Sequence, residues 1–120
     1  KIFDNIFSIF LRKLIQNYTG FASLHNLQEI EIPENSNLRI ISERSFSFSA
    51  ITHIKIPKHV QHFEMGTFFF CKNLKVIEFS EDSEILSIER EAFFQTSLST
   101  ISIPKNVKKI GERASLIVKI

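Results

Sequence analysis

The sequence predicts an α/β repeat solenoid in which each unit of about 23–24 residues contributes one short strand to a parallel stack. Two observations carry this prediction. Apolar residues recur in fixed columns at four points along the chain, and each copy opens with an L-x-x-I-x-I type of pattern. Such a pattern is typical of a short strand with one buried face. Irregular or short helical turns are expected on the side opposite the strands.

Four units start at Leu27, Ile51, Leu74 and Leu98, at steps of 24, 23 and 24 residues. Further apolar columns follow each start, and a phenylalanine column comes last. These columns are Ile30, Ile54, Ile77 and Ile101; Ile32, Ile56, Phe79 and Ile103; Leu38, Val60, Ile85 and Val107; Ile41, Phe63, Ile88 and Ile110; and Phe46, Phe68, Phe93 and Ser115. Because a unit buries its columns only against its neighbours, we expect a core of stacked like residues, with the phenylalanine column as the spine of one side.

The repeats occupy residues 21–115, and one short segment lies on each side of them. In the N-terminal cap, 1–20, Phe3, Phe7, Phe10 and Leu14 recur at helical spacing, which predicts an amphipathic capping helix over 2–16. The alternative is a degraded repeat, since "GFASLHNL" at 20–27 is similar to the unit end "TFFFCKNL". Residues 116–120 are expected to form a C-terminal tail or a capping strand.

The pattern "L..I.IP..V..I...AF..C..L", read at 51–74 and in variant form in the other units, resembles the BspA-like leucine-rich repeat. The alternation of "FFFCKNL" with "FFQTSL" is similar to the protist members of that family. The resemblance implies a leucine-rich repeat solenoid in a surface antigen of a bacterium or protist, with a role in adhesion or protein binding. Departures are Gly111, which supplies the usual "IG" in the last unit only, Ser115 in place of phenylalanine, and the unmatched segment 1–20.

Composition excludes several classes of function. A net charge of +2 gives no electrostatic reason to expect nucleic acid as a partner, and no uninterrupted apolar run reaches the ~18 residues of a membrane span. The single cysteine excludes an internal disulfide framework. A chain that begins at Lys1 is consistent with a fragment, so a missing signal peptide or anchor carries no information.

No residue constellation predicts catalysis, a cofactor or a metal site. His59-x-x-His62 has the spacing of a ligand pair, but the matching unit holds Asn106 and Lys109 there, so these slots are expected to be exposed and variable. Cys71 is expected to be small, soft and buried, without a neighbouring base that would make it a nucleophile. We therefore expect a non-enzymatic protein.

The outward-pointing positions of the four strands form three files, each with one residue from every strand. The third file alternates in charge and predicts an ion-pair ladder of Glu31, Lys55 and Glu78. These files are the candidate protein-binding face, although they would also serve simply to keep the sheet soluble. The files are Gln28, Thr52, Lys75 and Ser99; Glu29, His53, Val76 and Thr100; and Glu31, Lys55, Glu78 and Ser102. Asn17, in Asn17-Tyr18-Thr19, is a candidate N-glycosylation site if the chain enters the secretory path.

The repeat and its resemblance to the BspA-like family together imply a protein-protein interaction module of a surface adhesion or antigen protein, at the cell surface or secreted, whose partner is a host or matrix protein. The alternative is a cytoplasmic structural or assembly subunit of a larger complex, which docks through the apolar ends of the solenoid. The apolar N-terminal segment and the small number of units motivate this alternative.

Overall fold

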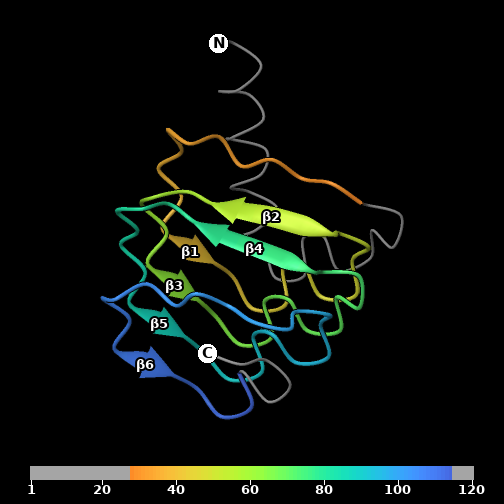
Figure 1. Ribbon diagram of the computed structural model, residues 1–120. Coiled ribbons are helices and arrows are strands. Elements are labelled where there is room, and N and C mark those ends of the chain that lie inside the picture. Colours follow the sequence, from red (N-terminus) through yellow and green to blue (C-terminus); the bar gives the residue numbers. More distant parts are fainter. Residues whose placement is uncertain (1–27, 115–120) are drawn as a thin grey trace.

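The computed structural model describes residues 28–114, which wind through successive turns that stack on one another (Figure 1). No helix occurs in this part of the chain, and none long and apolar enough to cross a membrane is found there. The strands, in chain order, are β1 (Ile40–Ile41), β2 (His53–Ile56), β3 (His62–Phe63), β4 (Val76–Phe79), β5 (Ser87–Ile88) and β6 (Lys109–Ile110).

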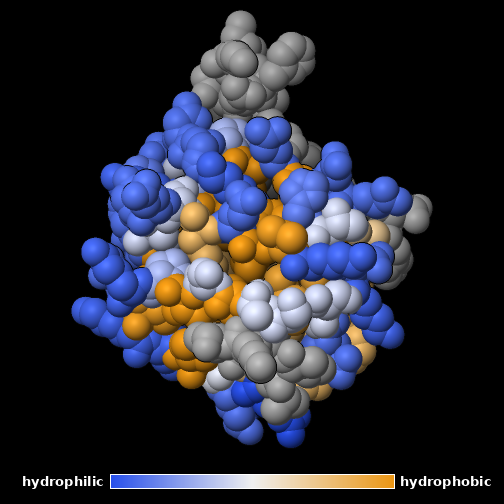
Figure 2. All heavy atoms as spheres, in the orientation of Figure 1, coloured by the Kyte–Doolittle hydropathy of each residue, from blue (hydrophilic) through white to orange (hydrophobic). Residues whose placement is uncertain are grey.

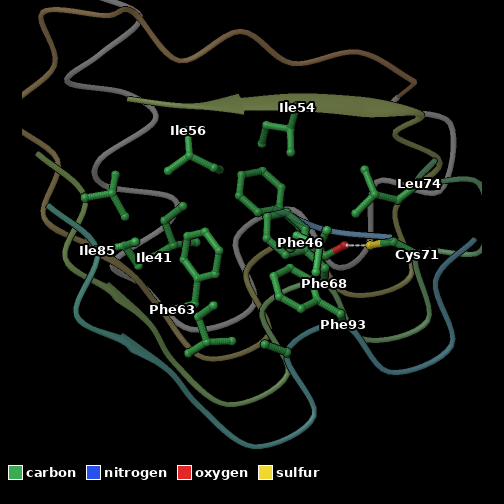
Figure 3. Close-up of a cluster of buried hydrophobic side chains, with 14 of the residues drawn as sticks. Ile41, Phe46, Ile54, Ile56, Phe63, Phe68, Cys71, Leu74, Ile85 and Phe93 are labelled. Atoms are coloured by element: carbon green, nitrogen blue, oxygen red, sulfur yellow. Dashed lines mark hydrogen bonds between the residues drawn. The ribbon is translucent and has the colours of Figure 1, made fainter. Parts of the chain in front are cut away.

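The predicted inward columns meet in a two-stranded parallel sheet made of β2 and β4. Its register pairs Ile54 with Ile77 and Ile56 with Phe79, as the column alignment predicts. The side chains of Ile54 and Ile56 are buried, and both point from β2 into the core (Figure 3). The parallel stacking of short strands is therefore confirmed, although the first and last units contribute no strand to this sheet.

A second parallel sheet, not predicted from the sequence, runs through all four units in the order β1–β3–β5–β6. It contains the column Ile41, Phe63, Ile88 and Ile110, whose members pair in register from unit to unit. The prediction of one strand per unit is thus corrected. Each of these strands has only two residues, and a two-residue strand is too short for the apolar–polar alternation that reveals a strand in a sequence.

The side opposite the strands consists of irregular turns. Successive backbone amides of a turn donate hydrogen bonds alternately to a carbonyl of their own unit and to a carbonyl of the next unit. Ser47 N donates to Arg44 O at 3.1 Å, whereas Phe46 N donates to Thr67 O at 3.0 Å. Arg44 and Phe48 also have positive φ angles, of 55° and 62°. Because an α-helix needs negative φ angles and bonds to the fourth preceding carbonyl, no α-helix forms within residues 28–114, and the expected short helical turns are not confirmed.

The phenylalanine column forms the predicted spine. The rings of Phe46, Phe68 and Phe93 are stacked nearly parallel, with centroids 5.5 and 5.8 Å apart, and all three side chains are buried. Phe63 meets this stack edge-on from the four-stranded sheet, at 5.6 Å from Phe68 (Figure 3). The core between the two sheets and the turns is therefore filled by repeated aromatic and aliphatic layers, each held by the units on either side.

The residues of the apolar columns are less buried in the last described unit than in the units before it. Val60 and Ile85 are completely buried, whereas Val107 in the same column is only half-buried. Likewise Ile88 is completely buried and Ile110 is 43% exposed. Among the described residues, Ile88 lies between two neighbouring units of the four-stranded sheet, whereas Ile110 has a described neighbour on one side.

Three predictions fall outside the described residues and stay predictions. They are the capping helix over 2–16 within the 1–20 cap, the candidate glycosylation site at Asn17, and the tail or capping strand at 116–120.

The stack of buried rings predicts that removing one ring lowers the stability of the protein. Phe68→Ala removes the ring between Phe46 and Phe93 and leaves a cavity, so the free energy of unfolding should fall by about 3–5 kcal/mol. Denaturant unfolding followed by circular dichroism measures this change. Glu64→Ala, at an exposed position of the same turn, is the control and should change stability by less than about 0.5 kcal/mol. Equal effects of the two substitutions would contradict the spine.

Candidate functional site

The twelve residues of the predicted binding face are all exposed, on or beside the sheet of β2 and β4. Strand register brings His53 beside Val76 and Lys55 beside Glu78. The face comprises Gln28, Glu29, Glu31, Thr52, His53, Lys55, Lys75, Val76, Glu78, Ser99, Thr100 and Ser102. The alignment of outward files thus correctly predicts which side chains reach the surface, while their role in binding stays a prediction.

Backbone hydrogen bonds hold neighbouring rows of this face together. Thr52 N donates to Gln28 O at 3.2 Å, and Lys75 N donates to Thr52 O at 2.9 Å. The hydroxyl of Thr52 also lies 3.2 Å from Nδ1 of His53. Val76 is the large apolar residue of the face, with 47% of its side chain exposed, and it is surrounded by polar and charged neighbours. The face therefore presents a regular polar surface on a rigid backbone with one apolar residue in it.

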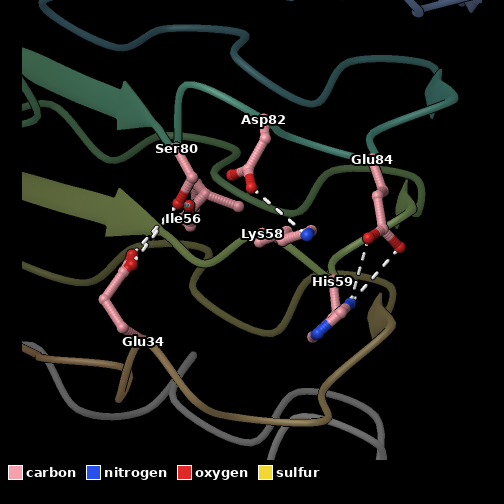
Figure 4. A network of polar contacts seen from close by, with 7 residues as sticks. All are labelled: Glu34, Ile56, Lys58, His59, Ser80, Asp82 and Glu84. Carbon is pink, nitrogen blue, oxygen red and sulfur yellow. Dashed lines mark hydrogen bonds and ion pairs between the residues drawn. The ribbon is translucent and has the colours of Figure 1, made fainter.

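The predicted ion-pair ladder along the third file does not form. The ammonium group of Lys55 lies 3.7 Å from the carboxylate of Glu34, rather than pairing with Glu31 or Glu78 (Figure 4 shows Glu34 at the end of β2). Glu34 also accepts a hydrogen bond of 3.0 Å from the hydroxyl of Ser80. These two contacts place Glu34, on the loop after Pro33, across the ends of β2 and β4. Both members of the Lys55 pair are more than half exposed, so the pair contributes little stability.

The two histidines of the His59-x-x-His62 motif face different partners. Nδ1 of His59 lies 3.1 Å from the carboxylate of Glu84 (Figure 4), and Nδ1 of His62 lies 2.7 Å from the hydroxyl of Ser87. Both rings are half-buried rather than fully exposed as expected. Each partner belongs to the following unit, so these contacts join units. Within residues 28–114 no group of three or more His, Cys, Asp or Glu side chains is placed to hold a metal ion.

An exposed ion pair lies beside His59 in the same network. The ammonium group of Lys58 is 3.2 Å from a carboxylate oxygen of Asp82 (Figure 4). The hydrogen bond that Lys58 donates lowers the pKa of Asp82 below its usual value. This pair also bridges two units, and its exposure makes it a weak contribution to stability.

Cys71 is buried, and its thiol has low reactivity. Its Sγ donates a hydrogen bond of 2.8 Å to the carbonyl oxygen of Phe46 and lies 3.5 Å from the hydroxyl of Ser49 (Figure 3 shows Cys71 at the edge of the core). Burial raises the pKa of the Cys71 thiol to about 11, well above the ordinary 9.0. Because the thiolate is the nucleophilic form, this cysteine is suited to packing and not to catalysis.

Sequence reasoning missed an aromatic cluster outside the spine. The aromatic corner consists of Phe48, Phe69, Phe70 and Phe94, on the turns. Phe48 stacks on Phe70 at 5.3 Å, and Phe69 stacks on Phe94 at 5.6 Å. Phe48 is 49% exposed, although Phe46 two residues earlier is completely buried. The signal for the corner was present in "SFSF", "TFFF" and "AFFQ", where further phenylalanines follow the spine position.

A cavity of about 390 Å³ opens beside the aromatic corner. Two cations lie over the rings of the corner: Nζ of Lys72 is 5.6 Å from the centroid of Phe70, and the guanidinium of Arg44 is 5.7 Å from that of Phe69. The cavity is lined by Phe48, Ser49, Ala50, Phe70, Lys72 and Asn73.

The repeat geometry agrees with a comparison against protein families, in which residues 5–115 match the BspA type leucine-rich repeat region in six copies. The chain belongs to this family. The match begins ahead of the first unit start at Leu27, so it also covers most of the segment 1–20 that was predicted as a cap. A search of curated protein sequences found no match.

Among solved structures, the BspA-type chain is similar to the pneumococcal vaccine antigen PcpA. The two share 31% sequence identity with a TM-score of 0.65, over 72% of this chain and 21% of the PcpA chain. The chain thus spans about a fifth of the length of that relative.

In this BspA-type chain, burial of the Cys71 thiol predicts slow alkylation of the folded protein. The folded protein should be alkylated by iodoacetamide at least about a hundredfold more slowly than the unfolded chain, because a pKa of about 11 instead of 9.0 lowers the thiolate fraction. Mass spectrometry of samples taken over time at pH 7, with and without guanidinium, gives both rates. Equal rates in the two conditions would show that Cys71 is accessible and reactive.

Proposed function

We propose that this chain is a non-enzymatic protein-interaction module of a surface-exposed or secreted adhesion protein, and that it binds through the twelve-residue sheet face. The observation that carries the proposal is the regular exposed face built across the stacked units of a BspA-type repeat. Repeat solenoids commonly use such extended surfaces to bind other proteins.

The composition of the sheet face supports protein as the ligand. Lys55, Glu78 and their neighbours supply charges of both signs, which suit a protein surface better than a uniformly charged polymer. Val76 supplies an apolar residue in the middle of a polar surround, an arrangement typical of protein interfaces. The ladder of backbone hydrogen bonds behind these residues keeps them in fixed positions, which reduces the entropic cost of binding.

The likeness to a vaccine antigen supports a location at the cell surface or outside the cell. The proposed partner is a host or matrix protein. Binding rather than catalysis is supported by the state of the reactive side chains, since the Cys71 thiol is buried and His59 and His62 make contacts that join neighbouring units.

One observation favours a second candidate function, an assembly subunit inside the cell that docks through an apolar end of the solenoid. The apolar columns lose burial at the last described unit, where Val107 is half-buried and Ile110 is 43% exposed. A partner with a matching apolar surface would cover these side chains of the last described unit. Elsewhere, Figure 2 shows apolar side chains gathered in the middle of the side of the molecule in view, with hydrophilic side chains around them.

The sheet-face proposal predicts the effect of removing its charges. A variant with Glu31→Ala, Lys55→Ala and Glu78→Ala should bind immobilised fibronectin, laminin or collagen at least about tenfold more weakly than the wild type, because charged interface contacts are lost. The control carries Glu43→Ala, Glu64→Ala and Glu112→Ala, three exposed carboxylates on the turns. Surface plasmon resonance measures the affinity. Equal weakening by both variants, or by neither, would contradict the assigned face.

The two candidate functions differ in where the chain lies. Intact source cells treated with a protease that cannot cross the membrane should lose the chain if it belongs to a surface protein. Detection by an antibody against the repeat region measures this loss. Protection on intact cells, followed by cleavage after permeabilisation, would overturn the surface proposal and favour the assembly subunit.

A further inference from the structure

The aromatic corner and its cavity form a surface separate from the sheet face. Six residues from two consecutive units line the cavity, and none of them belongs to the twelve residues of the sheet face. The volume of about 390 Å³ lies at the lower end of the range of about 300–1,000 Å³ that ligand pockets occupy. It therefore has room for a large side chain.

Backbone conformation explains why the rings of the corner lie at the surface. Phe48 and Phe70 occupy the same slot in consecutive turns, with φ angles of 62° and 57°. This left-handed conformation ends the turn and directs the side chain away from the core, and it is uncommon for a bulky residue. Gln95 fills the same slot in the next unit with a φ of 59°. The turn therefore does not require an aromatic residue at this slot.

The charges around the cavity have one sign. Lys72 lines the cavity with its ammonium group over the Phe70 ring, and Arg44 lies over the neighbouring Phe69 ring. Among residues 28–114 neither cation forms an ion pair with a carboxylate, and no acidic residue lines the cavity. The complementary ligand thus carries negative charge beside an apolar group.

We propose that this cavity binds an extended acidic segment of a partner protein, with one aromatic or aliphatic side chain of that segment against Phe48 and Phe70 and a carboxylate on Lys72. The stacked rings supply the apolar contact area, and the cation next to them selects for acidic flanking residues. The side-chain amide of Asn73, at an exposed position on the rim, is placed to hydrogen-bond the backbone of the segment.

A peptide titration tests the proposal directly. The probe is an acetylated and amidated pentapeptide with a central phenylalanine and two glutamates on each side, added to the full ¹⁵N-labelled chain. Amide shifts of Lys72 and Asn73 should report saturable binding. Replacing the central phenylalanine by alanine, or the four glutamates by lysines, should weaken binding at least about tenfold, because the first removes apolar burial and the second reverses the charge.

Two variants locate the binding, and a third serves as the matched control. Phe48→Asn removes the exposed ring but keeps a residue that tolerates positive φ, and Lys72→Gln removes the charge at an exposed position. Each of these two substitutions should weaken binding of the glutamate peptide at least about tenfold. Gln95→Asn, a change in the same slot of the next unit, should leave the affinity unchanged.

Three outcomes would overturn the proposal. The first is equal affinity for the glutamate and lysine peptides. The second is a set of shifts centred on Val76 and Lys55, which would place the peptide on the sheet face. The third is an absence of binding by the wild type, which would make the corner a packing feature only. If Phe48→Asn does not fold, Lys72→Gln still decides between these outcomes.

Discussion

The structure depends on in-register stacking of one unit on the next. Phe46 N, Phe68 N and Phe93 N each donate to a carbonyl of the following unit, at 3.0, 2.8 and 3.2 Å. The rings of the same three residues stack on one another in the core. A shift by one residue between two units would break both the backbone ladder and the ring stack. Because a unit by itself cannot enclose a core, stability here belongs to neighbouring pairs of units.

The same register orders the surface. Residues that occupy equal slots in successive units form rows, as the sheet face and the stacked pair of Phe48 and Phe70 show. The contacts of Lys58 and His59 in Figure 4 form a polar edge between the second and third units. The polar edge illustrates the limits of this order. Lys58 and His59 of the second unit contact Asp82 and Glu84 of the third unit. Such exposed pairs align units weakly compared with the buried rings.

Position in the stack also sets the chemistry of the reactive side chains. The thiol of Cys71 is buried between units, and this burial raises its pKa and leaves little of the nucleophilic thiolate. The thiol also donates a hydrogen bond to the Phe46 carbonyl. Polar side chains that are buried in the turns bond to nearby carbonyls; the hydroxyls of Ser45 and Thr67, for example, donate to the third preceding carbonyl at 2.7 Å. Buried polar groups thus stabilise the turns.

The sequence by itself determined the repeat, the inward columns and the ring spine. Each of these is a periodic choice of side chain, such as Ile54 with Ile77 or Phe68 with Phe93, and periodicity is visible without coordinates. It also separated the outward files of the candidate binding face from the core. Only the tertiary structure decided the second sheet, the pairing of Lys55 with Glu34, and the cavity at Phe48 and Lys72. The column of Ile41 and Phe63 in the second sheet is periodic, but a two-residue strand is too short to show the alternation that reveals a strand. The ion pair and the cavity depend on contacts between side chains of different units, which the sequence pattern does not show.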